Sequence, residues 1–315
     1  MDCSRWLFIT ILILILFNVE MCMKKGQYSR TAEAAAALRA NHSLFSKEPI
    51  FNDAYAYAMT SKLWQLLLKQ PLMSKLFNSQ LVNRTMGRLT AQVVGRSRYA
   101  EDQLKQAINK GINQYVLVGA GLDSFVLRQL HYYPKLRIFE VDHPDTQYLK
   151  KQKLEQLGDI SDQIEFVSID FKKESIADAL TRSSFDSNQA AFFSWLGTTH
   201  YLENPTTLAT LASIAHIAGV DSEVVLDYSI DFNELKGIEK IGTQFVAIFT
   251  QVLGEPLQGQ FKPLDLHHQV EKIGFRVLED LSGEALTQRY FHMRADQMKH
   301  TTATHMLHLK LNGLT

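Results

Sequence analysis

Two glycines and a later carboxylate stand at a spacing that suits the binding of a nucleoside. The run VLVGAGLDSF at 116–125 carries Gly119 and Gly121 directly after a short apolar, β-rich segment. Glycine lets the chain turn tightly and lets a ligand approach the backbone, because it has no Cβ. About 20 residues further on, where an acid would accept hydrogen bonds from ribose hydroxyls, the chain has Asp142. Glu140 lies two residues earlier and points to the same side of a strand, so either carboxylate could serve.

The residues of this turn favour a cationic ligand over a dinucleotide. The dinucleotide fingerprint G-x-G-x-x-G requires a third small residue, and the chain has Ser124 at that position. Asp123 also places a negative charge in the turn, whereas a pyrophosphate needs a bare helix N-terminus. S-adenosylmethionine carries a sulfonium and an ammonium group, so the sequence predicts this cofactor. A dinucleotide-dependent oxidoreductase is the alternative.

The composition excludes several other classes of function. The 315 residues are 46% hydrophobic and 21% charged, as in an ordinary globular protein. Lys and Arg together number 33, as do Asp and Glu, so no net basic field is available to hold a nucleic acid. The two cysteines, Cys3 and Cys22, both lie near the N-terminus. A disulfide scaffold, a zinc–cysteine site and a cysteine nucleophile are therefore not expected in the remainder of the chain.

The elements that must position the turn follow an alternating pattern. Helical patterns come first, and strands then alternate with helices, which is typical of a parallel sheet built from βαβ units. We therefore predict an α/β fold with a seven-stranded, mainly parallel sheet and one antiparallel strand at its end. Residues 24–315 form one domain in this interpretation, with an N-terminal helical cap over about 24–111 and a Rossmann-like core over about 112–315. The expected helices are 29–44, 59–77 and 81–111, and the expected strands are 114–121, 136–142, 162–171, 190–197, 222–229, 274–282 and 289–294.

Residues 1–23 read as a hydrophobic leader. The apolar run at 6–17 is short for a membrane span, which needs about 20 residues, and no A-x-A cleavage site follows it. Basic residues are more numerous after the run than before it. One interpretation is a membrane tether through residues 6–19 that leaves the body facing the cytoplasm. The others are a true start at Met21 or Met23, which gives a soluble cytoplasmic protein, and a cleaved export signal.

Five motifs, taken together, resemble a known family. RSRYAEDQL, VLVGAGLDSFVLR, FEVDHPDTQYLKK, SIDF and FFSWLGTTHYL occur in this order. They are similar to the leucine carboxyl methyltransferase-like family, and in particular to its bacterial branch of S-adenosylmethionine-dependent methyltransferases. The resemblance covers the chain from about Ser29 to the fifth strand and is weaker beyond it. It implies a class I methyltransferase fold with added N-terminal helices, and methyl transfer to a carboxylate or hydroxyl oxygen of a small molecule or peptide.

The resemblance also implies which residues bind the methyl donor. Gly119, with Ala120 and Gly121, matches the donor-binding turn, and Asp142 matches the acid that holds the ribose. Asp170 and Phe171 match a pair that contacts the adenine, with Phe standing where the family has Leu.

Three further positions of the family pattern carry expectations. Arg98 matches the arginine that grips the carboxylate of the donor, and Arg30, between Ser29 and Thr31, belongs to the segment that closes over the donor. Leu196 stands where many members have Glu. That departure puts in doubt any contact this Glu makes near the methyl group, and it keeps open a third alternative, a membrane-tethered protein that binds S-adenosylmethionine without turnover.

The acceptor side is less clearly marked. His200, Tyr201 and Tyr228 follow the fourth and fifth strands and are candidates for a general base, which a hydroxyl acceptor can require and a carboxylate does not. Residues 231–256 are expected to cover the acceptor pocket. No metal is expected, because no carboxylate or cysteine cluster accompanies the histidines, which we place at the surface: His267, His268, His300, His305 and His308.

Overall fold

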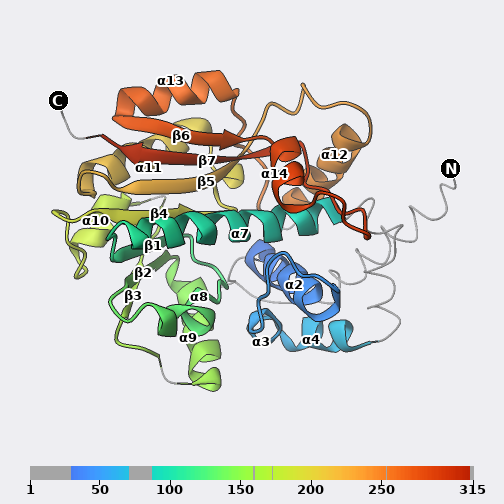
Figure 1. Ribbon diagram of the computed structural model, residues 1–315, viewed down its shortest axis with the longest axis horizontal. Helices are drawn as coiled ribbons and strands as arrows, with labels where there is room; N and C mark the ends of the chain where they lie inside the picture. Colours follow the sequence, from blue (N-terminus) through green and yellow to red (C-terminus); the bar gives the residue numbers. More distant parts are fainter. Residues whose placement is uncertain (1–29, 71–86, 159, 172, 253, 313–315) are drawn as a thin grey trace, which may run out of the picture.

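A seven-stranded sheet forms the centre of the molecule (Figure 1). The computed structural model describes residues 30–70, 87–158, 160–171, 173–252 and 254–312. Within these ranges the strands lie in the order β3-β2-β1-β4-β5-β7-β6. Their bounds are β1 Gln114–Val118, β2 Arg137–Asp142, β3 Ile164–Ser168, β4 Ala191–Trp195, β5 Glu223–Ser229, β6 Phe275–Leu281 and β7 Thr304–Leu311.

Strands β1 to β5 pair with one another in parallel, and β7 is antiparallel to both β5 and β6. The expected α/β class and the single antiparallel strand are confirmed, but β7 lies inside the sheet and not at its end. The prediction of a strand at 289–294 is wrong, because that stretch begins with the last two residues of helix α14 (Gly283–Tyr290). The Ser282 hydroxyl caps the first turn of this helix by accepting a hydrogen bond from the Ala285 amide.

Each face of the sheet is covered by helices and forms its own apolar core. Along β1, Val116 and Val118 belong to one core, and Tyr115 and Leu117 belong to the other, as the alternation of side chains along a strand requires. The first core includes α10 (Ile176–Thr181), α11 (Asn204–Ile217) and α13 (Pro263–Ile273). The second includes α7 (Gly87–Asn109), α8 (Phe125–Arg128), α9 (Pro144–Leu157) and α14.

Three short N-terminal helices lie together beside α8 and α9 (Figure 1). They are α2 (Arg30–Phe45), α3 (Ala56–Met59) and α4 (Lys62–Lys69). Because α2 is rich in alanine, it can pack closely, and Ala36 and Ala40 are fully buried. The single helix expected at 59–77 is instead α3 followed by α4, and the sequence between 71 and 86 lies outside the described residues.

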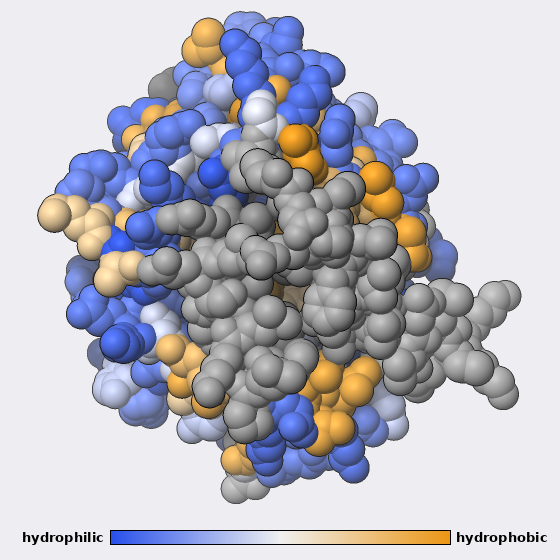
Figure 2. Space-filling model, turned by 90° about the vertical axis from the view of Figure 1, so that its right-hand side faces the viewer, coloured by the Kyte–Doolittle hydropathy of each residue, from blue (hydrophilic) through white to orange (hydrophobic). Residues whose placement is uncertain are grey.

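The side of the molecule that carries α12 (Gly237–Val252) faces the viewer in Figure 2. Its described surface is mainly hydrophilic, with separate hydrophobic patches. Ile241, Ile248 and Val252 of α12 are exposed. Among the described residues, no helix is both long and apolar enough to cross a membrane. The leader at 1–23, and with it the expected tether at 6–19, lies outside the described residues.

Candidate donor-binding site

A cavity of about 480 Å³ opens at the carboxyl ends of β1, β2 and β4, within the size range of small-molecule sites. This is where the strand order reverses, the usual ligand site of an open α/β sheet. The loops after β1, β2 and β4, the loop at 254–258, and helices α2 and α7 contribute to its walls. The lining residues include Thr31, Arg39, Arg96, Gly119, Ala120, Gly121, Leu122, Asp123, Asp142, His143, Leu196, Gly197, Thr198, Tyr201, Gly254, Glu255, Pro256 and Gln258.

The glycine turn after β1 is held against the end of β2. The amides of Gly119 and Ala120 donate to the carbonyl of Val141 over 2.8 Å and 3.2 Å. Gly119 has φ +68° and Gly121 has φ +50°, a region that glycine adopts readily. A Cβ on Gly119 would lie 2.8 Å from Oγ1 of Thr198. The turn therefore requires glycine here, and it exposes backbone to the cavity.

Asp142 lies at the end of β2 and joins this turn. Its Oδ2 accepts a hydrogen bond from the Gly121 amide over 2.5 Å, and its Oδ1 accepts one from the His143 amide over 2.6 Å. Burial raises the pKa of this carboxyl group, and the two amide bonds oppose that rise. A carboxylate has about four acceptor positions, so capacity remains for hydroxyl donors in the cavity.

Glu140, the other carboxylate that could have bound the ribose according to the sequence, pairs with a lysine instead. Its carboxylate contacts Nζ of Lys150 at 2.7 Å, and both side chains are 1% exposed. Glu140 is not among the residues that line the cavity. Of the two acids, the structure brings Asp142 to the glycine turn.

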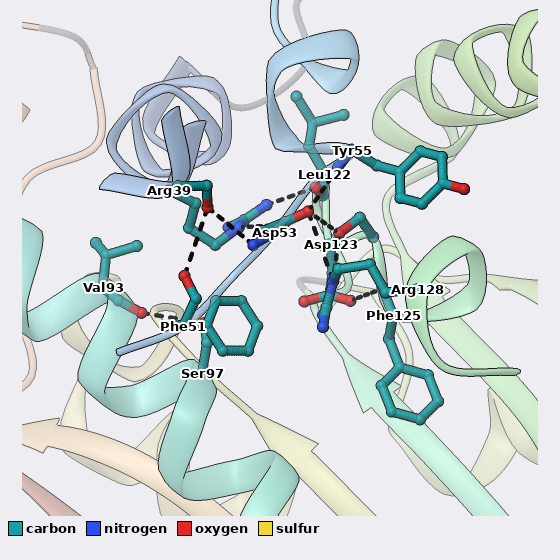
Figure 3. Close-up of polar contacts among 12 residues, drawn as sticks. Arg39, Phe51, Asp53, Tyr55, Val93, Ser97, Leu122, Asp123, Phe125 and Arg128 are labelled. Carbon is teal, nitrogen blue, oxygen red and sulfur yellow. Dashed lines mark hydrogen bonds and ion pairs between the residues drawn. The ribbon is translucent and has the colours of Figure 1, made fainter. Parts of the chain in front are cut away.

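Ser124, at the position of the third glycine of a dinucleotide fingerprint, belongs to a buried polar network (Figure 3). Its hydroxyl donates to Oδ1 of Asp53 over 2.5 Å and accepts from Nε of Arg128 over 2.8 Å. Arg39 of α2 donates to Oδ2 of Asp53 over 2.9 Å and to the Leu122 carbonyl over 2.7 Å. The network therefore fastens the N-terminal helix to the glycine turn.

Of the two arginines in the motif RSRYAEDQL, Arg96 lines the cavity and the expected Arg98 does not. Arg98 projects from the other side of α7, where its side chain is 47% exposed and pairs with Asp102 at 2.9 Å. Arg96 lines the cavity and donates from Nη1 to Oδ2 of Asp227 over 3.1 Å. Residues two apart on a helix differ by about 200° in direction, because a turn holds 3.6 residues. The face of α7 that packs on the sheet thus decides which arginine reaches the site.

Three other residues expected to contact the donor do not line this cavity. Asp170 pairs with Nζ of Lys173 at 2.8 Å, and Phe171 packs against the first core. Arg30 is the first residue of α2, whereas its neighbour Thr31 does line the cavity.

Comparison with known proteins identifies the family of this chain. A family model described as leucine carboxyl methyltransferase matches residues 32–215, more than half of the sequence. The chain belongs to the leucine carboxyl methyltransferase family. YktD of Bacillus subtilis (strain 168), named as a candidate S-adenosyl-L-methionine-dependent methyltransferase, is 28% identical over 302 residues, which cover 91% of this chain and 99% of YktD. A Mycobacterium marinum protein named in the same way is 26% identical over 221 residues, 67% of each chain.

The structure of a candidate methyltransferase from Thermobifida fusca YX has the same fold, with a TM-score of 0.60 at 12% identity, over 92% of this chain and 97% of that one. The fold is therefore the class I methyltransferase fold. The chain is an S-adenosylmethionine-dependent methyltransferase, and S-adenosylmethionine is its cofactor. The cavity fits this group chemically, because Asp142 can accept from ribose hydroxyls and Arg96 can pair with a carboxylate.

Of the three candidate bases of this methyltransferase, only Tyr201 lines the cavity. Burial raises its pKa to about 12. His200 is 5% exposed, and its ring nitrogens contact Oγ of Ser229 at 2.8 Å and Oδ2 of Asp227 at 2.9 Å. Tyr228 is fully buried and donates to Asp280 over 2.7 Å. The phenol of Tyr201 therefore belongs to the wall of the methyltransferase site, whereas the imidazole of His200 is turned toward Asp227 and Ser229.

The expected surface position is wrong for two of the histidines. His300 is 3% and His308 is 5% exposed, because a sheet strand and its flanking loop carry them into the interior. His308 contacts Oε2 of Glu223 at 2.9 Å, and Nδ1 of His300 contacts the carbonyl of Thr301 at 2.8 Å. In the part of the chain that the structure describes, no three His, Cys, Asp or Glu side chains gather to hold a metal ion.

Sequence reasoning did not single out Arg96 or Gln258, and it named the 231–256 segment without saying which of its residues line the site. Arg96 is the first residue of the motif RSRYAEDQL. A helical wheel of α7 would have shown it as a second candidate, on a different face of the helix from Arg98. Gly254, Glu255, Pro256 and Gln258 also line the cavity. They lie at the end of the expected 231–256 segment and just beyond it. The amide of Gln258 bonds to the carbonyl of His200 over 2.8 Å, a contact between distant segments that no local pattern shows.

Proposed function

We propose that this methyltransferase transfers the methyl group of S-adenosylmethionine to an oxygen of a carboxylate. The supporting observation is that none of the three candidate bases, His200, Tyr201 and Tyr228, presents a deprotonated base to the described cavity at neutral pH. His200 is turned toward Asp227 and Ser229, and the raised pKa of Tyr201 keeps its phenol protonated near neutral pH. His143 lies beside Asp142, and its Nδ1 accepts from the Asp145 amide over 3.3 Å.

A carboxylate acceptor fits this wall because it is already ionised at neutral pH and needs no base. S-adenosylmethionine supplies an activated methyl group on a sulfonium centre. The chain then has to bind the two substrates and hold them in line, which is where such a reaction gains most of its rate. A hydroxyl acceptor would have to lose a proton during methylation, whereas a carboxylate acceptor has no proton to lose.

In this proposal the turn at 119–121 approaches the donor through its backbone, and Asp142 accepts from the ribose hydroxyls. Arg96 pairs with the carboxylate of the donor, in the role that the sequence motif suggested for Arg98. Asp170, Phe171 and Arg30 do not line the described cavity, and this proposal assigns them no contact with the donor. The acceptor enters beside Leu196 and Tyr201 under the loop at 254–258, and is a small molecule or a peptide.

The chemistry of the product tests the proposal. The enzyme would be incubated with radiolabelled S-adenosylmethionine and matched acceptor pairs that share one skeleton and carry either a carboxylic acid or an alcohol. A methyl ester releases volatile labelled methanol in mild base, whereas a methyl ether does not. We expect base-labile label from the acids alone. Label that resists base would overturn the carboxylate assignment, and failure to bind S-adenosylmethionine would overturn the donor roles.

A further inference from the structure

Asp227 lies at the carboxyl end of β5 and joins three segments that meet at the cavity. It is 1% exposed and is not among the lining residues. Its Oδ1 accepts from the Gly197 amide over 2.6 Å. Its Oδ2 contacts Nη1 of Arg96 at 3.1 Å and Nε2 of His200 at 2.9 Å. One carboxylate thus bonds to helix α7, the loop after β4, and the short helix η2 (Thr199–Tyr201).

The neighbours of Asp227 stabilise the ionised form of its carboxyl group. His200 and the Arg96 guanidinium hold the pKa of this carboxyl group far below its usual value, although burial alone would raise it. The carboxylate is therefore ionised at neutral pH, and its buried charge is balanced by Arg96. If Arg96 moved away, the buried carboxylate would lose its balancing charge, which is strongly unfavourable, so the ion pair holds the guanidinium in place.

Gly197 forms the other side of the clamp on Arg96. It has φ +70°, and a Cβ on it would lie 2.5 Å from Nη2 and 2.6 Å from Nη1 of Arg96. The guanidinium therefore packs directly on the Cα of Gly197. Because the Gly197 amide also bonds to Asp227, one carboxylate sets the position of both surfaces that enclose the arginine.

His200 extends the same contacts to the opposite wall. Its backbone carbonyl accepts from the amides of Gln258 and Gly259 over 2.8 Å and 3.1 Å. A Cβ on Gly259 would lie 2.4 Å from the carbonyl oxygen of Thr199, so the loop at 254–259 packs tightly against η2. The fixed position of η2 is thereby passed to Gln258, which lines the cavity.

We propose that Asp227 is a positioning residue for the methyl donor. It does not touch the donor; it holds Arg96 against Gly197 so that the guanidinium meets the carboxylate of the donor in one orientation. This inference rests on the donor role proposed for Arg96, and it is independent of which acceptor is methylated. Nothing in the sequence motifs marked Asp227, which lies within β5 near the end of a mainly apolar strand.

A double-mutant cycle on donor affinity tests this role. Titration calorimetry with S-adenosylhomocysteine, which retains the carboxylate, would compare the wild type with Asp227→Asn, Arg96→Ala and the double variant. We expect each single variant to weaken binding about 10- to 100-fold, as loss of a charge-assisted contact does. We expect the double variant to bind no more weakly than Arg96→Ala alone, because Asp227 acts through Arg96. Effects that multiply in the double variant would overturn the proposal.

Asp280→Asn is the matched control. Asp280 is also largely buried and bonds to His267, His305 and Tyr228, but it does not line the cavity. It should lower the unfolding temperature and leave the affinity unchanged. If Asp227→Asn does not fold, Gly197→Ala displaces the same guanidinium. We expect it to weaken binding at least 10-fold with Arg96 present and by less than about threefold in the Arg96→Ala background. Unchanged affinity of Gly197→Ala with Arg96 present would contradict the inference.

Discussion

Replacement of Asp142 by Ala removes the contact on which the donor assignment depends most directly. In the structure its carboxylate accepts two backbone amides and faces the cavity. A ribose would add two hydroxyl donors, and a hydrogen bond to a charged group contributes about 1.5–3 kcal/mol. Two such bonds amount to about 3–6 kcal/mol, so we expect Asp142→Ala to raise the dissociation constant for S-adenosylmethionine about 10²- to 10⁴-fold.

Titration calorimetry measures this change, and two further variants separate its causes. Asp142→Asn keeps one side-chain acceptor for the amides of the turn, so it should preserve more of the folding stability than Asp142→Ala. It should still weaken the binding of S-adenosylmethionine. Glu140→Gln alters the acid on the same side of the strand, which is engaged by Lys150, and should change affinity by less than about threefold. A dissociation constant for Asp142→Ala within about threefold of the wild type would refute the reasoning, as would a larger loss in Glu140→Gln.

Two further predictions concern stability. His42 accepts the Ile50 amide at Nε2 over 3.0 Å, and burial, aided by Arg294, lowers its pKa from 6.5 to about 4. The unfolded chain therefore binds a proton that the folded state refuses. The free energy of unfolding should fall as pH drops from about 6.5 to 4, by up to about 3 kcal/mol from this group. His42→Gln retains a hydrogen-bond acceptor, so the unfolding free energy obtained from urea titrations should depend less on pH in this variant. An unaltered pH dependence would rule this out. Asp53→Ala should cost about 3–5 kcal/mol, because it leaves Arg39 without its buried partner; calorimetric melting that shifts by less than about 2 °C would contradict that.

Local sequence patterns sufficed for the parallel part of the sheet. The runs that became β1, β2, β4 and β5 are short and apolar, and each lies between helical patterns, so both their existence and their order could be predicted. The last strand failed for a physical reason. The aromatic stretch at 289–294 has strand-like composition, yet Ser282 caps a helix that runs through Tyr290. The alternation in THMLHLKL at 304–311 was the signal for β7.

The sequence could predict the parts of the site that follow from the order of strands and turns. It could not predict the parts that depend on tertiary contacts between distant segments. Gly119 and Asp142 meet because adjacent parallel strands end at one edge, which follows from topology. The choice of Arg96 over Arg98 depends on which face of α7 packs on the sheet. Asp142 is preferred over Glu140 because Asp142 ends β2 beside the glycine turn, whereas Glu140 pairs with Lys150 of α9. The role of Asp227 depends on three segments that are separated by up to 131 residues, and no spacing rule covers such a contact.

The position of β7 between β5 and β6 has a consequence for biosynthesis. Translation makes β6 before β7, so until the final strand emerges neither β5 nor β6 has a partner at the edge that β7 will occupy. Unpaired edges of apolar strands readily pair with other chains, and nascent chains expose such surfaces. We therefore expect the nascent chain to be most prone to self-association, and most dependent on chaperones, just before its last strand is synthesised.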